Sequence, residues 1–429
     1  MEYKLITERL SLYIPNGHVC FVVKLCKVLD IEFLRKAVKK VLQKHPILRS
    51  SIRMDENGKA YYHVEDEVES AFFVDTINND RDWISAVYQE QKKPFILSQP
   101  PLIRFTCLKN ESEMQLVMCV HHILADGLSG IRILQDIISF VENPEQAVTV
   151  QPVALLEDSP LYNKEKLPLP MRMLAGILNK QWQKSSHIFS EEEYNAMRNN
   201  YWSQRSHIID VAQLDASETS KLIAKCKENH VTVNSLLLAT LLGATQKING
   251  VSKESKRVGM AVSINPNERN VGNFVVPVSI NSVYHPRKSI WDNTSVIQAL
   301  VKKKLNCDKT RYFALTFIKA LDVNLIDSIY FSLFGDFSGK ATGFLKNLFG
   351  YAKKPTHMGI TNLGKSGLSA EHGIKSIYFI PPITATADKI AGIVTTNNEM
   401  KIVYQYLNQE NSRVNKQIFE DWIDRLRKL

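Results

Sequence analysis

Hydrophobic positions change their spacing along the first fifty residues in a way that predicts a strand, a helix and a second extended segment. Residues 19–25 read VCFVVKL, an apolar run typical of a strand. After Asp30, apolar residues recur every three or four positions up to Leu42, which predicts an amphipathic helix. The ring of Pro46 disfavours helix at His45, so ILRSSI should continue extended. The pattern predicts a βαβ-like opening.

Two more apolar runs, residues 102–108 and 114–120, flank the polar sequence KNESE and predict a β-hairpin. The second strand leads directly into His121 and His122. Apolar positions with helical spacing then continue to residue 141, so we expect a helix after Asp126-Gly127. The histidine pair should therefore lie in a strand-to-helix loop, where α/β proteins tend to carry functional residues.

Periodicity is lost over residues 142–190, which contain ENPEQ, DSP and KLPLP, and this loss favours a linker at 151–190. The linker would separate an N-terminal domain, residues 1–150, from a C-terminal domain, residues 191–429. In the second domain we expect strands at 257–264, 274–281, 375–380 and 401–406, and helices at 218–228, 233–247, over a long region before 375, and from 414 to the end. Both domains are predicted to be mixed α/β.

Composition narrows the class of protein. The chain has 429 residues, enough for two domains of ordinary size, and its net charge of +10 favours anionic partners such as nucleotides, phosphopantetheine groups, acidic carrier proteins or anionic surfaces. No zinc-finger or RNA-binding signature accompanies the charge, which argues against nucleic acid. No apolar stretch is long enough to span a bilayer and no signal-peptide pattern is visible, so we expect a cytoplasmic protein.

The cysteines are scattered without a C-x-x-C pair, so they are expected to be reduced thiols of the core. They are Cys20, Cys26, Cys107, Cys119, Cys226 and Cys307.

Residues 121–127, HHILADG, carry the main candidate for chemistry. A neutral histidine can take a proton from a hydroxyl or an amine and return one to a leaving group. Asp126 can accept hydrogen bonds within the loop or pair with a cation, and Gly127 permits the positive φ angle that a sharp turn can require. Because adjacent strand residues point to opposite sides, one of His121 and His122 should face the core. Adjacent residues seldom converge on one ion, so no metal site is predicted.

HHILADG resembles the HHxxxDG signature of the acyltransferase superfamily that includes chloramphenicol acetyltransferase, condensation domains of nonribosomal peptide synthetases, alcohol acetyltransferases and polyketide-associated acyltransferases. Further stretches follow in the order in which the superfamily has them: KHPILRSSI, HVTVNSLLLATLL, VGNFVVPV and ITNLG. The resemblance implies a monomer of two chloramphenicol-acetyltransferase-like lobes, each a mixed sheet flanked by helices, with an active-site channel between them.

The resemblance also implies the reaction and its participants. His122 would be the general base that activates an alcohol or amine acceptor, with acyl-CoA or a carrier-protein thioester as co-substrate, no bound cofactor and no acyl-enzyme. Asp126 would complete the catalytic motif in a structural role. The residues expected at the substrate-binding region are His121, Gly127, Asn273, Thr361 and Asn362.

Two departures separate the chain from condensation domains. The segment that would carry an arginine as salt-bridge partner of Asp126 reads Ser263-Ile-Asn-Pro266, which leaves Arg269 or Arg49 as candidates. An H-Q-D followed by P-F-E is also missing after Phe274. Both absences favour a free-standing acyltransferase, with a condensation-type module or a catalytically degenerate carrier-binding module as alternatives.

Three other features suggest different functions. Residues 359–366, GITNLGKS, match the phosphate-loop pattern GxxxxGK[ST] but lack the flanking strand and helix that this loop needs. No G-x-S-x-G occurs, so Ser129 is expected to cap a helix rather than act as a nucleophile. The aromatic segment 312–350 is interpreted as helices on the second-lobe sheet, with an apolar tunnel or a peripheral lipid-contact surface as alternatives.

Overall fold

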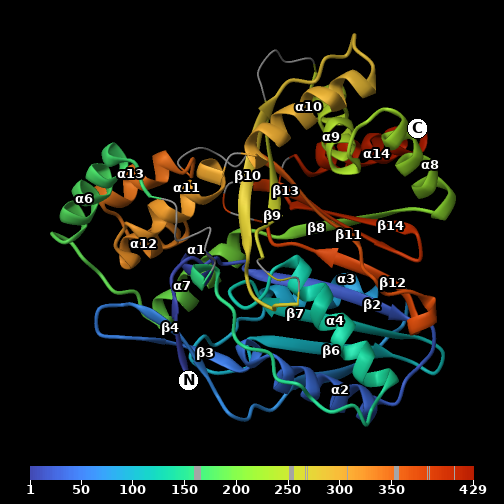
Figure 1. Ribbon diagram of the computed structural model, residues 1–429, viewed down its shortest axis with the longest axis horizontal. Coiled ribbons are helices and arrows are strands. Elements are labelled where there is room, and N and C mark those ends of the chain that lie inside the picture. Colours follow the sequence, from blue (N-terminus) through green and yellow to red (C-terminus); the bar gives the residue numbers. More distant parts are fainter. Residues whose placement is uncertain are drawn as a thin grey trace.

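The computed structural model describes the chain except residues 159–165, 251–255, 266, 268, 307, 352–356, 384, 386 and 410, together with the side chains of residues 256, 308–312 and 357. Cys307 and Pro266, which belong to the expectations above, lie outside the described residues. Figure 1 shows two lobes, each built on a sheet, and a layer of helices beside them. The fold class is mixed α/β, as predicted.

The sheet of the first lobe has five strands in the order β12-β2-β7-β6-β5. Strands β5 and β6 are parallel, and the other neighbours are antiparallel. The strands are β2 (His18–Leu25), β5 (Ala71–Thr76), β6 (Ile103–Lys109), β7 (Met114–His121) and β12 (Ile374–Ile380). Every residue of β2 and β7 is buried, which explains why both read as unbroken apolar runs.

Helices of the first lobe begin and end where the sequence indicates. Helix α2 (Ile31–Lys44) is capped by Asp30, whose side chain accepts a hydrogen bond from the amide of Glu32, and it ends just before Pro46. The other helices of this lobe are α3 (Asp82–Lys92) and α4 (Gly127–Glu142).

The prediction of a βαβ-like opening is wrong. Residues 46–49 form a 3₁₀ turn rather than an extended segment, and β3 (Ser50–Met54) does not join β2. Instead it pairs with β4 (Ala60–Val64), which also pairs with β1 (Glu2–Leu5), in a separate three-stranded sheet.

The sheet of the second lobe has six strands in the order β10-β9-β11-β13-β14-β8. Strand β11 runs parallel to both of its neighbours, and the other pairs are antiparallel. The strands are β8 (His207–Leu214), β9 (Lys256–Ser263), β10 (Val275–Ser282), β11 (His357–Lys365), β13 (Ala387–Thr396) and β14 (Glu399–Leu407). The helices of this lobe are α8 (Ala216–Glu228), α9 (Val233–Asn249), α10 (Ile290–Leu305) and α14 (Ser412–Arg427).

The expected domain boundaries need two corrections. The linker 151–190 contains helix α6 (Leu169–Trp182), so much of it is ordered secondary structure. Strand β12 comes from the C-terminal part of the chain but pairs with β2, so the first lobe is not made of residues 1–150 alone. The chain therefore passes from β11 of the second-lobe sheet to β12 of the first-lobe sheet and back to β13.

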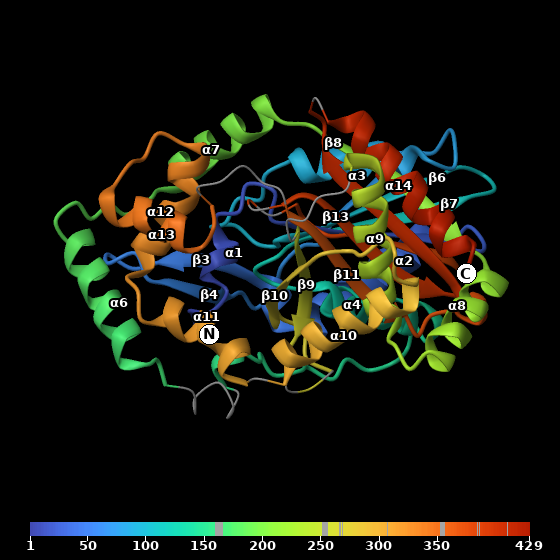
Figure 2. The same cartoon turned by 90° about the horizontal axis from the view of Figure 1, so that it is seen from above.

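The helices of the aromatic segment form their own layer, visible at the left of Figures 1 and 2. The expectation that they pack on the second-lobe sheet is confirmed only in part, since Leu315 lies in one apolar cluster with Val276 of β10. In this layer α12 packs against α1, α7 and α13, while α6 packs against α11 and α13. Its members are α1 (Arg9–Leu12), α6, α7 (Glu191–Gln204), α11 (Asp308–Lys319), α12 (Val323–Phe334) and α13 (Lys340–Leu348).

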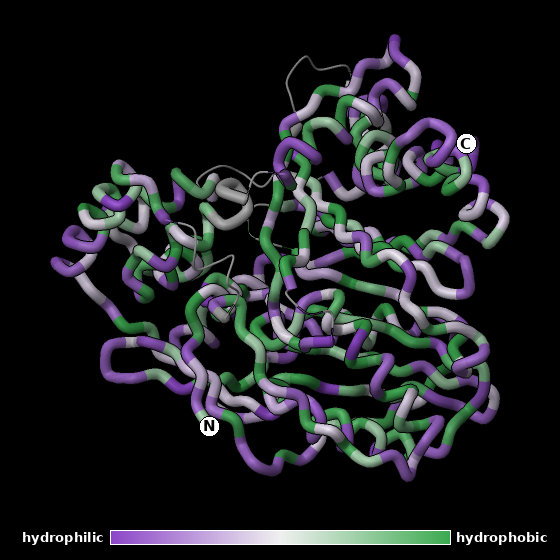
Figure 3. Tube along the Cα trace, in the orientation of Figure 1, coloured by the Kyte–Doolittle hydropathy of each residue, from purple (hydrophilic) through white to green (hydrophobic). Residues whose placement is uncertain are grey.

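Two main hydrophobic cores follow this division. One joins the first lobe with the helical layer, and the other lies between the second-lobe sheet and helices α8, α9, α10 and α14. Figure 3 shows hydrophobic residues along the central strands of the large sheets. Among the described residues no helix is long and apolar enough to cross a membrane.

The described cysteines are free thiols, and four of them are buried. Cys26 is exposed, so the expectation that all cysteines lie in the core is wrong for this residue.

Candidate functional site

The HHILADG loop connects the end of β7 to the first turn of α4, and its backbone is fixed on both sides. The amide of His121 donates to the carbonyl of Leu102 (2.9 Å), and the amide of His122 donates to the carbonyl of Gly17 (2.7 Å). Within the loop, the amide of Leu124 donates to the carbonyl of His121 (2.9 Å). The histidine pair is therefore positioned by backbone bonds to two neighbouring segments as well as by its own turn.

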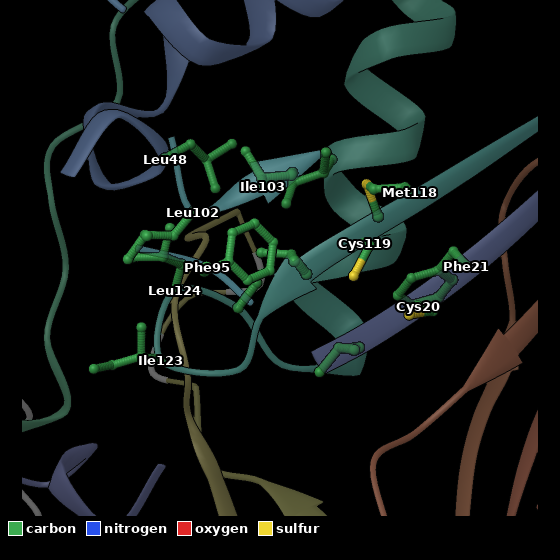
Figure 4. Close-up of a cluster of buried hydrophobic side chains, with 14 of the residues drawn as sticks. Cys20, Phe21, Leu48, Phe95, Leu102, Ile103, Met118, Cys119, Ile123 and Leu124 are labelled. Atoms are coloured by element: carbon green, nitrogen blue, oxygen red, sulfur yellow. The ribbon is translucent and has the colours of Figure 1, made fainter. Parts of the chain in front are cut away.

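A dense apolar cluster supports the loop. Figure 4 shows Ile123 and Leu124 at one end of a group of side chains from the first-lobe sheet and its neighbours. Both are almost fully buried, and the hydroxyl of Tyr62 donates to the carbonyl of Ile123 (2.9 Å). The other labelled members are Cys20, Phe21, Leu48, Phe95, Leu102, Ile103, Met118 and Cys119. Close packing on this scale leaves the loop little room to move.

His122 has one ring nitrogen occupied by the loop itself. Its Nδ1 lies 3.2 Å from the carbonyl oxygen of Ala125. A carbonyl oxygen only accepts, so Nδ1 must carry the hydrogen, and the lone pair of the neutral ring is then on Nε2. No hydrogen bond to this Nε2 comes from the described residues, and the side chain remains partly exposed. The geometry leaves a basic nitrogen available to an incoming molecule.

Burial lowers the pKa of His122 below its ordinary value, although the nearby carboxylate of Asp126 raises it in part. The imidazole is therefore neutral near pH 7, which is the form that can accept a proton.

His121 is fully buried, as expected for one member of the pair. Its Nδ1 accepts a hydrogen bond from the amide of Ile123 (3.2 Å). Burial, together with the nearby basic groups of His122, Arg198 and Arg104, lowers the pKa of His121 to about 3. Since it stays neutral and inside the core, His121 shapes the loop rather than exchanging protons.

Asp126 binds backbone amides from both lobes. One carboxylate oxygen accepts from the amide of Ser129 (2.8 Å), which caps α4, and the other accepts from the amide of Phe274 (3.1 Å), just before β10. Its own amide donates to the carbonyl of Gly272 (3.1 Å). Burial raises the pKa of Asp126, and these amides oppose that effect. The residue thus fixes the loop to the segment that leads into β10.

The expected arginine partner of Asp126 is replaced by these amides. Arg269 is exposed, and Arg49 donates to the carbonyl of Asp66. In the described part of the chain neither forms an ion pair with Asp126. The expectation of a salt bridge is wrong because the backbone supplies the hydrogen-bond donors.

Ser129 has a related role that differs from the predicted one. The cap of α4 is Asp126, whereas the Ser129 hydroxyl donates to the carbonyl of Gly272 (2.7 Å) in the second lobe.

Glycine is required at position 127 because a side chain would not fit there, rather than because of a positive φ angle. It is not among the glycines with positive φ. A Cβ atom on Gly127 would lie 2.7 Å from Cδ2 of Leu363 and 3.1 Å from Cζ of Phe379. The start of α4 therefore lies directly against β11, which brings the segment ITNLG next to the histidine loop.

The remaining substrate-site candidates lie near the loop and bond to protein groups. Asn273 follows Gly272, and its side-chain amide donates to the hydroxyl of Ser11 (3.2 Å). Asn362 accepts from the amide of Gly364 (3.0 Å), and Thr361 is half-buried in β11 opposite Gly392. Their place beside Leu363 and Gly272 is consistent with a wall of the site, and their contact with substrate stays a prediction.

The phosphate-loop match does not form a phosphate loop. Residues 359–365 belong to β11, and the chain continues through a short 3₁₀ turn into β12. Without a helix after the glycines no amide cluster faces a phosphate. The described residues also contain no group of three or more His, Cys, Asp or Glu side chains arranged to hold a metal ion.

Sequence reasoning missed the residues that position the loop through their backbones. Gly17 accepts from His122, while Gly272 and Phe274 bond to Asp126 and Ser129. The sequence VGNF offered a weak signal, since a Cβ on Gly272 would lie 2.7 Å from the ring of Phe274.

Comparisons with known proteins agree with this arrangement. Residues 16–163 match the family model described as the condensation domain. The chain is 25% identical over 307 residues to a linear gramicidin synthase of Brevibacillus parabrevis, covering 63% of this chain and 4% of that protein. It is 22% identical over 343 residues to the N-acetyltransferase SLI1 of Saccharomyces cerevisiae, covering 67% of this chain and 71% of that protein.

Solved structures support the fold. The first condensation domain of the calcium-dependent antibiotic synthetase superposes with a TM-score of 0.66 at 12% identity, over 98% of this chain and 93% of that chain. The polyketide synthase associated protein 5 of Mycobacterium tuberculosis superposes with a TM-score of 0.61 at 15% identity, over 99% of this chain and 97% of that chain. At this identity the likeness concerns the two-lobed fold alone.

Proposed function

Because the chain is related to condensation domains in sequence and shares their fold, we propose that it transfers an acyl group from a thioester to an amine or alcohol, with His122 as the general base. One observation carries the proposal. The Nδ1 of His122 donates to the carbonyl of Ala125, so the lone pair of the neutral ring lies on Nε2, which forms no hydrogen bond with the described residues.

The proposed reaction uses His122 twice. Its Nε2 takes the proton from the acceptor nitrogen or oxygen as that atom attacks the thioester carbonyl. The carbon–sulfur bond then breaks, and the protonated His122 gives the proton to the leaving thiolate. During the step the positive ring is stabilised by the Ala125 carbonyl, which accepts from Nδ1, and by the nearby Asp126 carboxylate. Donor and acceptor therefore exchange one acyl group and one proton, without an acyl-enzyme.

The nature of donor and acceptor is part of the proposal. The net charge of +10 favours a donor that bears phosphate, such as coenzyme A or the phosphopantetheine arm of an acidic carrier protein. The chain is similar to the yeast N-acetyltransferase over 71% of that protein, which favours an amine acceptor. Both substrates would reach His122 through a channel between the lobes.

The proposal is tested by following free thiol released from a panel of acyl thioesters with and without candidate amines and alcohols. Acceptor-dependent release by the wild type supports it. His122→Ala should lower kcat/KM by at least about a hundredfold, the usual scale of general-base catalysis, with its circular dichroism unchanged.

His187→Ala is the matched control, because His187 lies on the surface in an exposed pair with Glu193 and should turn over normally. Thioester binding without any acceptor-dependent release would indicate a binding module instead of an enzyme. Wild-type turnover by a folded His122→Ala variant would show that another group is the base.

A further inference from the structure

Helix α6 presents apolar side chains to solvent along one side. Leu169, Met173 and Ile177 recur every four residues, and each is 61% exposed. In a helix this spacing puts side chains on one face. A Cβ atom on Gly176, on the same side, would meet no atom within 4 Å. This row of side chains, which we call the α6 stripe, is uncovered along its length.

The neighbouring helix α13 also exposes apolar side chains. Phe344 and Leu348 are 46% and 45% exposed, one helical turn apart, and they follow the exposed Lys340 by four and eight positions. A Cβ on Gly343 would also meet no atom within 4 Å. Helices α6 and α13 pack against each other and form the outer end of the helical layer, at the left of Figures 1 and 2.

The charges on this outer end are of one sign. Residues 166–190 contain four cations, Lys166, Arg172, Lys180 and Lys184, and no Asp or Glu, the nearest acids being Glu165 and Glu191 at its two ends. Residues 337–350 contain the exposed Lys340 and the half-buried Lys346, whose Nζ donates to Ser332, and again no acid, the nearest being Asp336 in the preceding loop. An apolar row edged by cations alone is the pattern of helices that lie in the interface of an anionic membrane.

The two alternatives fit these observations less well. A self-contact between copies would place cations against cations, because no acid accompanies them on either helix. A small acidic protein would match the charge but would not need a row of three aliphatic side chains that are each more exposed than buried. Large exposed apolar patches with a polar rim indicate a contact surface.

We propose that the outer face of α6 and α13 docks the protein on anionic lipid surfaces, with the α6 stripe entering the headgroup region and the flanking cations contacting lipid phosphates. This surface is distinct from the HHILADG loop and goes beyond the proposed acyl transfer. The expectation of lipid contact from the sequence concerned residues 312–350 and did not include α6.

The test is cosedimentation of the 429-residue chain with vesicles of phosphatidylcholine, with or without about 30% phosphatidylserine. The wild type should bind the vesicles that contain phosphatidylserine, and the double variant Met173→Glu, Ile177→Glu should bind at least about tenfold more weakly. Arg172→Glu with Lys180→Glu should also weaken binding, by about fivefold or more for each charge. Gly176→Leu should strengthen it, because the added side chain extends the stripe.

A matched control is the double variant Phe33→Glu, Val150→Glu, which makes the same chemical change at side chains that are 52% and 59% exposed elsewhere. It should bind as the wild type does. Thiol release without vesicles should be equal in all these variants, so failure of the docking proposal is distinguishable from failure of the proposed enzyme activity.

Three results would overturn the docking surface. The wild type could fail to sediment with either vesicle type, or the control and the α6 variant could lose binding equally. Light scattering could also reveal a wild-type dimer that Met173→Glu, Ile177→Glu converts to a monomer, with no vesicle binding, in which case the face joins two copies of the chain.

Discussion

The HHILADG loop and the outer face of α6 expose opposite kinds of groups. In the loop a carboxylate, Asp126, is fully buried and its charge is compensated by backbone amides of both lobes. On α6 three aliphatic side chains are left in solvent while the charged ones flank them. A buried charge costs free energy unless hydrogen bonds compensate it, and an exposed apolar row indicates a contact surface. The first region is built to hold one geometry, and the second to meet a partner.

The glycines of the two regions make the same contrast. In α4 a Cβ on Gly130 would lie 2.2 Å from the ring of Phe21, whereas in α6 a Cβ on Gly176 would meet nothing. Replacing glycine by alanine should therefore destabilise the protein at Gly130 and stabilise it at Gly176.

The largest effect is expected for Asp126→Ala. The amides of Ser129 and Phe274 would lose their acceptor in a buried site, and α4 would lose its cap, at a cost of about 3 kcal/mol in the free energy of unfolding. Urea denaturation measures this cost. The matched control is Asp215→Ala, which removes an exposed cap of α8 and should cost about 1 kcal/mol. Equal losses for the two variants would mean that Asp126 does not join the lobes.

Gly130→Ala should destabilise the protein by about 2 kcal/mol, because the methyl group would overlap an aromatic ring in a close-packed core. The midpoint of thermal unfolding reports the change. An unaltered midpoint would indicate that Phe21 has room to move and that the loop rests on a looser core than the distances imply.

The pH dependence of kcat/KM should follow the neutral form of His122. Since burial lowers the pKa of this residue, activity should persist to lower pH than an ordinary histidine, with a pKa of about 6.5, would allow. Below its pKa the rate should fall tenfold per pH unit. A pH profile of thiol release is the measurement, and an acidic limb above the ordinary histidine value would contradict the assignment.

Gly176→Ala should stabilise the protein slightly, by about 0.5–1 kcal/mol, because alanine is the better helix former and the position is open. Urea denaturation measures this change in the free energy of unfolding. Destabilisation by this substitution would mean that the outer face of α6 is covered in solution, which would remove the contrast with α4.

Local patterns in the sequence were sufficient for several elements. The apolar run VCFVVKL, the cap at Asp30 and the stop at Pro46 define β2 and α2, and the two runs around KNESE define β6 and β7. The alternation of a strand also predicted that one histidine of the pair would face the core, and His121 is the buried one.

Long-range pairings were not accessible in this way. The sequence of an apolar strand does not identify the strand with which it pairs. Nothing in residues 374–380 therefore showed that they would join β2, some 350 positions earlier in the chain. The prediction of an arginine as salt-bridge partner of Asp126 was wrong for a related reason. Backbone amides occur at every residue, so those of Ser129 and Phe274 leave no trace in the sequence although they bind the carboxylate.

The crossing of β12 into the first lobe also bears on how such a chain can be divided. Without Ile374–Ile380, β2 would become an edge strand with a row of unpaired backbone groups along one of the most apolar segments of the chain. Exposed edges of this kind pair readily with other chains. Residues 1–150 expressed alone should therefore aggregate, and recombination between relatives at the connection after α4 would produce two incomplete halves. The unit that can be inherited, exchanged or transplanted is the pair of lobes together.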